Sequence, residues 1–126
     1  MRRARCMDVW LDGGLQFEAA FQDSASTPEG DRVAVHEYGI RVEVDDQTRL
    51  VNWIAATPHV LPFRECPGAV DNVRLLVGQP VDELRWRVPQ SLKGQLGCTH
   101  LNDALRALAG VAALVDVRDG RFLLQR

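Results

Sequence analysis

Cysteine and histidine side chains in the second half of the chain have the types and spacing needed for metal binding or thiol chemistry. Cys98 and His100 flank a single residue at a predicted helix start, and Cys66 precedes Pro67, which favours the first turn of another helix. A helix start stabilises thiolate through free amide donors and the positive end of the helix dipole. Thiolate and neutral imidazole are preferred zinc ligands. The two cysteines are therefore candidates for one site, and the alternative is that both are buried apolar thiols.

The other histidines carry weaker patterns. His36-Glu37 lies in a predicted strand, and position 40 is Ile, so the second histidine of the helical zinc-protease motif is missing. His59 lies in a proline-flanked stretch. Taken alone, His36 and His59 are better explained as structural or exposed residues. The chain has 3 cysteines, all far apart, which predicts reduced thiols rather than a disulfide framework.

The first half of the chain has the alternating pattern of strands. Apolar residues recur at every second position from Leu15 to Phe21, which predicts a hairpin turning at Asp12-Gly13-Gly14. We expect residues 1–7 to be flexible. The further predictions are a loop at 23–31, a strand at 32–44, a turn at 45–48, a strand at 49–56 and an irregular stretch at 57–62, where prolines remove backbone donors.

After Cys66 the apolar residues change to helical spacing. The pattern predicts a helix from Pro67 to Gly78, a second from Pro80 to Trp86 that stops near Pro89, and a longer one from Thr99 to Val111. Residues 114–125 read as a last strand with a turn at Asp119-Gly120. The predicted fold is α+β, with an antiparallel β-sheet in the N-terminal two-thirds packed against C-terminal helices. Residues 1–126 are expected to form a single domain.

Composition excludes several classes of function. The 15 basic and 17 acidic residues nearly balance, so no concentrated basic surface is expected and nucleic acid is an unsuitable partner. No apolar run is long enough for a membrane span or a signal peptide, which favours a cytoplasmic protein. A small molecule or another protein remains as partner, and a homodimer is left open.

Several motifs together resemble a bacterial domain of unknown function that carries the number 2889. They are His36-Glu37-Tyr38, the strand from Ile40 to Asp45, a single Cys66, Leu76-Val77-Gly78 and Gly97-Cys98-Thr99-His100-Leu101. The resemblance covers roughly Asp8 to Leu108. This chain departs from the family pattern after His36, where an acidic residue followed by Met is expected and Glu37-Tyr38 stands. The family implies no activity.

The order of elements is also remotely similar to U-type iron–sulfur scaffold proteins and their zinc-containing sulfur-acceptor relatives. Cys66 and Cys98 match the second and third cysteines of that pattern, and His36 stands where the first cysteine is absent. This similarity implies a scaffold-like topology in which His36, Cys66 and Cys98 meet at one end of the sheet. His100 or Glu37 would complete a four-ligand set.

The leading interpretation is a metal-binding protein whose ligands come from His36, Cys66, Cys98 and His100. Zinc is the first expectation and iron or an iron–sulfur cluster the second. A site with an open coordination position would make the protein a metal-dependent enzyme, with Cys98, His100 and Glu37 as candidate catalytic residues. A closed site would be structural or a scaffold.

Two alternatives involve no metal. The first is an enzyme or small-molecule-binding domain that uses Cys66 or Cys98 as a nucleophile beside a histidine. The second is a structural, dimeric accessory protein with buried cysteines. Thiol accessibility with and without a chelator separates these alternatives from a metal site.

Overall fold

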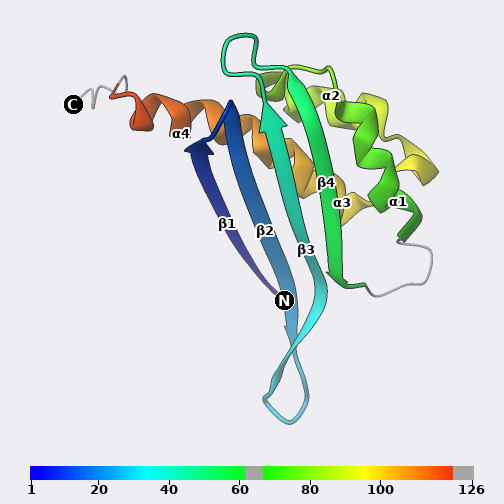
Figure 1. Ribbon diagram of the computed structural model, residues 1–126. Helices are drawn as coiled ribbons and strands as arrows, with labels where there is room; N and C mark the ends of the chain where they lie inside the picture. Colours follow the sequence, from blue (N-terminus) through cyan, green and yellow to red (C-terminus); the bar gives the residue numbers. More distant parts are fainter. Residues whose placement is uncertain (62–66, 121–126) are drawn as a thin grey trace.

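A four-stranded antiparallel sheet forms one layer of the protein. The computed structural model describes residues 1–61 and 67–120. The strands are β1 (Arg2–Leu11), β2 (Leu15–Ser26), β3 (Arg32–Val44) and β4 (Val51–Val60), and they lie side by side in sequence order (Figure 1). Each strand pairs with the next through a hairpin, so β1 and β4 are the two edges.

The second layer is helical and covers one face of the sheet (Figure 1). Its elements follow the sheet in the chain and are the C-terminal helices of the predicted α+β fold. They are α1 (Pro67–Asp71), η1 (Asn72–Leu76), η2 (Val81–Glu83), α2 (Leu84–Ser91), η3 (Gly94–Leu96), α3 (Thr99–Ala107), η4 (Leu108–Gly110) and α4 (Val111–Arg118). Within the described ranges, no helix has the length and apolar character needed to span a membrane.

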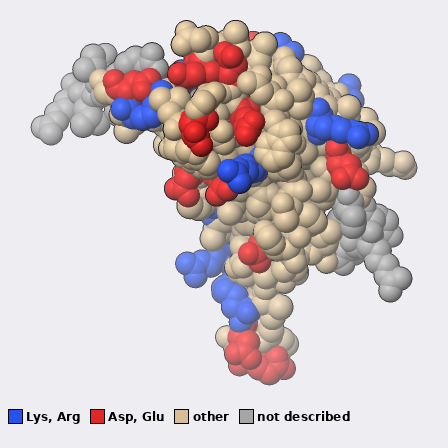
Figure 2. Space-filling view, in the orientation of Figure 1, with Lys and Arg blue, Asp and Glu red and all other residues tan. Residues whose placement is uncertain are grey.

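The hydrophobic core lies between the two layers. Alternate residues of the central strands point toward the helices, as two-residue periodicity requires, and α3 contributes residues at helical spacing. The fully buried members include Leu15, Phe17, Tyr38, Val42, Leu76, Leu84, Leu105 and Leu108. The opposite face of the sheet carries charges of both signs, with no single sign dominating the visible face (Figure 2).

Two predicted turns are confirmed. The chain reverses between β1 and β2 at Asp12-Gly13-Gly14, where the amide of Asp12 donates to the carbonyl of Gly14 at 3.0 Å. Between β3 and β4, Asp45 Oδ1 accepts hydrogen bonds from the backbone amides of Gln47 at 2.9 Å and Thr48 at 2.7 Å. This side-chain mimic of a turn explains why β3 ends just before Asp45, as predicted.

The proline-containing end of β4 differs from the prediction. We expected residues 57–62 to be irregular, but β4 continues through Pro58 to Val60 and pairs with β3. Because β4 is an edge strand, a residue without an amide hydrogen is tolerated on its outward side. The register shifts between Glu37 and Tyr38, opposite this proline.

The ends of the predicted sheet are also corrected. The loop expected at 23–31 is shorter, because β2 continues to Ser26. The expected flexible segment, residues 1–7, is almost entirely within β1 and pairs with β2. The last strand, expected at 114–125, is helix α4 up to Arg118, and residues 121–126 lie outside the described part of the chain.

Pro89 does not stop the second helix where expected. Helix α2 runs to Ser91 with Pro89 inside it. A proline removes the hydrogen bond to the carbonyl four residues earlier, here that of Arg85. The Nε of Arg106 in α3 donates to this carbonyl at 3.1 Å, so a neighbouring helix satisfies the freed acceptor.

Two neighbouring leucines of η1 provide a test of this packing. Leu76 is fully buried and Leu75 is 45% exposed. Leu76→Ala should lower the free energy of unfolding by about 2–5 kcal/mol, because it leaves a cavity between the layers. Leu75→Ala should change it by less than about 1 kcal/mol. Urea denaturation of both variants measures the difference, and equal losses would contradict the assigned inner face of η1.

Candidate metal centre

A row of paired residues crosses three strands at the end of the sheet nearest the β2–β3 loop. Arg3 of β1 pairs with Asp23 of β2, and Asp23 pairs with His36 of β3. Directly paired residues project from the same face of an antiparallel sheet, so these three side chains are neighbours under the helical layer. Beyond this row the register shifts: Ser24 pairs with Ala34, which leaves the residue before His36 without a partner.

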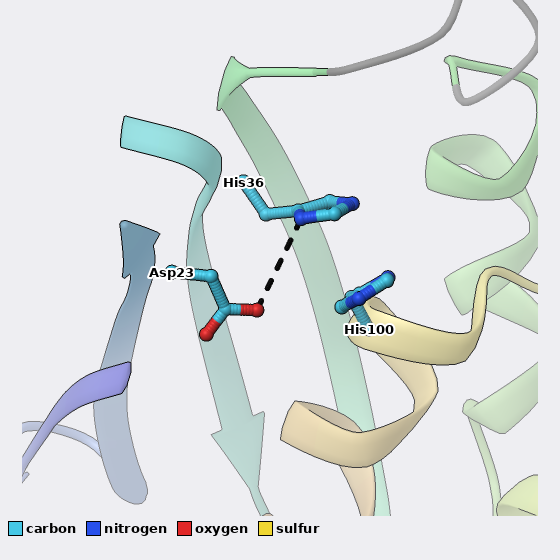
Figure 3. A group of neighbouring side chains, drawn as sticks. All are labelled: Asp23, His36 and His100. Atoms are coloured by element: carbon cyan, nitrogen blue, oxygen red, sulfur yellow. Dashed lines mark ion pairs between the residues drawn. The ribbon is translucent and has the colours of Figure 1, made fainter. Parts of the chain in front are cut away.

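His100 joins the row from the helical layer. It lies in the first turn of α3, and its imidazole stacks on that of His36 with ring centroids 3.6 Å apart and planes inclined by 22°. Figure 3 shows the carboxylate of Asp23 pointing toward His36, with the ring of His100 on the helix side. The three side chains therefore come from two strands and one helix that are distant in sequence.

The three side chains have the composition and spacing of a ligand group. One ligand atom from each of Asp23, His36 and His100 lies within 4.8 Å of the other two. His36 Nδ1 lies 4.0 Å from Asp23 Oδ2, which is too long for a hydrogen bond. His36 Nδ1 is buried and has no hydrogen-bond partner in the described part of the chain. Such an orphaned nitrogen is costly unless another group binds it.

Arg3 holds the carboxylate of Asp23 from the other side. Its Nε lies 2.5 Å from Asp23 Oδ1, and its terminal nitrogen lies 2.7 Å from Oδ2, which makes a two-pronged ion pair. The guanidinium also contacts Asp103 of α3, which Arg5 binds at 2.9 Å. The hydrogen bonds from Arg3 lower the pKa of Asp23, against the opposing effect of burial. Asp23 is therefore ionised at neutral pH.

His36 is held in its neutral form. Burial is the main cause of its lowered pKa, and the neighbouring His100 lowers it further, while Asp23 acts in the opposite direction. A neutral imidazole has a free lone pair on one nitrogen, which is the form that binds metals.

The hallmark segment Gly97-Cys98-Thr99-His100-Leu101 has a structural explanation as well. A side chain at Gly97 would lie 2.5 Å from the amide of Asn102, which itself donates to the carbonyl of Leu92 at 3.1 Å. Only glycine leaves room for this link between α2 and α3. Leu101 is buried in the core, so the segment anchors α3 while His100 faces the strand row.

The structure brings only some of the predicted site residues together. His36 and His100 are in contact, whereas the thiol of Cys98 lies 3.9 Å from the hydroxyl of Tyr38 and is not in the three-residue group. Glu37 projects from the opposite face of the sheet, where it accepts a hydrogen bond from Gln22 at 3.1 Å. Cys66 lies outside the described residues.

Asp23 and Arg3 were missed by the sequence reasoning. Asp23 opens a stretch of Ser, Thr, Pro and Gly that reads as a loop, and Arg3 lies in the segment expected to be flexible. The available signal was the alternation of Leu15, Phe17 and Phe21, which continues in step to Asp23. A charged residue at an inward position of a strand requires a partner, and this one has Arg3.

The fold and this group define an α+β protein with a buried carboxylate beside two stacked histidines. A family model described as a protein of unknown function (DUF2889) matches residues 1–114, and the chain belongs to this family. No match was found among curated proteins or among solved structures. The remote similarity to iron–sulfur scaffold proteins is therefore not confirmed.

The lowered pKa of His36 predicts a pH dependence of stability in the metal-free protein. The unfolded chain takes up a proton on this imidazole as pH falls below its ordinary 6.5, and the folded chain resists it. Unfolding should therefore become easier from about pH 6.5 downward, until the folded-state pKa is reached. His36→Gln should reduce this slope, measured by urea denaturation with a chelator between about pH 7.5 and 5.5. An unchanged slope would show that His36 is not the group responsible.

Proposed function

We propose that the protein binds one divalent transition-metal ion through Asp23, His36 and His100. The observation that carries this proposal is the convergence of three ligand atoms within 4.8 Å of one another, from the buried Asp23 and His36 and the partly buried His100. Two imidazoles and one carboxylate form a ligand set suited to zinc and to ferrous iron. The orphaned Nδ1 of His36 supports the proposal, because a bound ion would satisfy it.

The fit requires only a small adjustment of the side chains. Tetrahedral ligand atoms at roughly 2.1 Å from zinc lie about 3.4 Å apart. The three ligand atoms here lie within 4.8 Å of one another, so they would have to move slightly closer together. Rotation of the two stacked rings would turn their lone pairs from parallel to convergent. The backbone elements carrying them, β3 and α3, are held by the core and need not move.

Arg3 is compatible with a cation at Asp23. Each carboxylate oxygen accepts more than one contact, so the two-pronged ion pair leaves acceptor capacity on Asp23. The charge of Arg3 is balanced by two carboxylates, those of Asp23 and Asp103. In this arrangement Arg3 would orient the ligand, as outer hydrogen-bond partners of metal sites usually do.

Zinc is the first candidate metal and iron the second. Zinc accepts imidazole and carboxylate in a tetrahedral arrangement, and the same three groups bind ferrous iron on one side of an octahedron. Either metal would have open positions for water or substrate, because three protein ligands do not complete its coordination. A site of this kind supports Lewis-acid or hydrolytic chemistry.

Substitution of each of the three histidines tests the site. His59 is the control, because it is exposed on the opposite face of the sheet. His36→Ala and His100→Ala should weaken zinc binding by at least about 100-fold, since each removes a direct ligand. His59→Ala should bind as the wild type does. Isothermal titration calorimetry of untagged, chelator-treated protein with zinc measures the affinities. Equal binding in all three variants would refute the site.

Cys98 decides whether the site has a fourth protein ligand. Cys98→Ser should leave zinc affinity nearly unchanged if the ligand set is Asp23, His36 and His100. A large loss in this variant would add Cys98 to the set and would require the thiol to turn away from Tyr38. Asp23→Asn should weaken binding in either case, because it removes the negative charge that balances the cation.

The second candidate function is thiol chemistry at Cys98. One observation favours it: this partly exposed cysteine lies at the start of α3, two residues before His100. Thiol labelling separates the candidates. Labelling of Cys98 that is fast with or without chelator supports a nucleophile, and zinc binding that is independent of labelling supports the three-ligand site. Slow thiols without metal binding would support a structural protein.

A further inference from the structure

A cavity of about 390 Å³ lies beside the three-residue group, between β1, the last turn of α2 and the length of α3 from Thr99 to Arg106. Its wall is shared with the candidate metal centre through His100. The residues used below are Arg3, Pro89, Thr99, His100, Asp103 and Arg106, all of which line it. A substrate in this space would therefore touch a proposed metal ligand directly.

Positive charge predominates around the cavity. Arg3 and Arg5 together face the single carboxylate of Asp103, and Arg3 is also paired with Asp23. Arg106 adds a third guanidinium, which forms no ion pair with any of the described residues. Three cations thus stand against two carboxylates, before any metal ion is counted.

Arg106 is exposed, and one hydrogen bond holds its side chain in place. Its Nε donates to the carbonyl of Arg85, the acceptor that Pro89 frees within α2. This single hydrogen bond uses one of the five guanidinium donors and fixes the direction of the side chain. The terminal nitrogens remain for a ligand, and Pro89 itself forms part of the same wall.

We infer that this cavity binds the oxyanion of a small substrate, a carboxylate or a phosphate group, next to the metal ion. The inference rests on the proposed function for the position of the metal. The terminal nitrogens of Arg106 would form a two-pronged contact with the anion, the geometry that guanidinium groups favour with carboxylate and phosphate. Thr99 adds a hydroxyl donor at the exposed start of α3, where Cys98 supplies no side-chain cap.

The two nearby carboxylates do not prevent an anion from binding here. Asp23 and Asp103 are both engaged by arginines, which offset their negative charges. A metal ion bound through His100 would add further attraction for an anion. The substrate class is therefore a small acid whose anionic group reaches both Arg106 and the metal.

In the first experiment, metal-free protein is titrated with inorganic phosphate and, separately, with acetate. Amide chemical shifts in NMR spectra report the binding. Shifts should concentrate along α3 from Thr99 to Arg106, and affinity should fall with ionic strength. Arg106→Ala should weaken binding of the preferred anion by about 10-fold or more. The control is Arg87→Ala on α2, because Arg87 pairs with Glu83 and does not line the cavity.

The outcomes separate this inference from the proposed function. Loss of anion binding in Arg106→Ala but not in Arg87→Ala supports the inference, and Arg106→Gln repeats the test with an uncharged polar side chain. Equal behaviour of the Arg106 and Arg87 variants, or no binding of either anion, overturns it. Zinc binding without anion binding refutes this inference alone. Anion binding without zinc binding refutes the metal centre and leaves an anion-binding cavity.

The two anions also distinguish the source of the group. Preference for phosphate assigns the cavity to phosphorylated substrates, and preference for acetate assigns it to carboxylic acids. Repeating the titration with zinc-loaded protein tests the position of the metal. Tighter anion binding in the loaded protein supports direct contact with the metal, and unchanged affinity contradicts that contact.

Discussion

The register between β2 and β3 is the constraint on which the rest of the candidate centre depends. Pairing of Asp23 with His36 sets both side chains under the helical layer, and pairing of Arg3 with Asp23 extends the row to β1. The buried apolar pairs maintain this register, among them Phe21 with Tyr38, whose rings stack with centroids 5.3 Å apart. A slip of one residue would turn every inward side chain to the other face. The packing of the core therefore determines the relative positions of Arg3, Asp23 and His36.

The parts of the fold that could be predicted are those in which local pattern and tertiary packing agree. Strand β3 alternates regularly from His36 to Val44 and is bounded by turn residues, so its limits from Arg32 to Val44 were predicted in full. Pro58 and Pro89 were misjudged because local chemistry argues against strand and helix at those positions. In each case the tertiary structure removes the energetic cost of the proline. Pro58 lies in an edge strand, and Arg106 donates to the carbonyl of Arg85 that Pro89 leaves without its helical partner.

The candidate centre was predictable only in its histidines. His100 stands out by its place near a helix start, and His36 was raised as a ligand by a remote similarity that the comparisons do not confirm. Asp23 and Arg3 gain their meaning from each other, as partners on adjacent strands. Such pairing is set by the register of the whole hairpin, and no motif of neighbouring residues encodes it. Cys98 was considered as a ligand because of its neighbours in sequence, while in the structure its thiol lies 3.9 Å from the hydroxyl of Tyr38.

The contact between Arg3 and Asp103 joins positions 100 residues apart, nearly the full length of the chain. During synthesis the four strands leave the ribosome before α3 is made. The apolar face of the sheet therefore stays uncovered until the helices have been synthesised. An ion that requires both His36 and His100 can therefore bind only after the last third of the chain has docked. Metal acquisition would follow folding instead of guiding it, and the nascent sheet is the stage at which this protein is most exposed to aggregation.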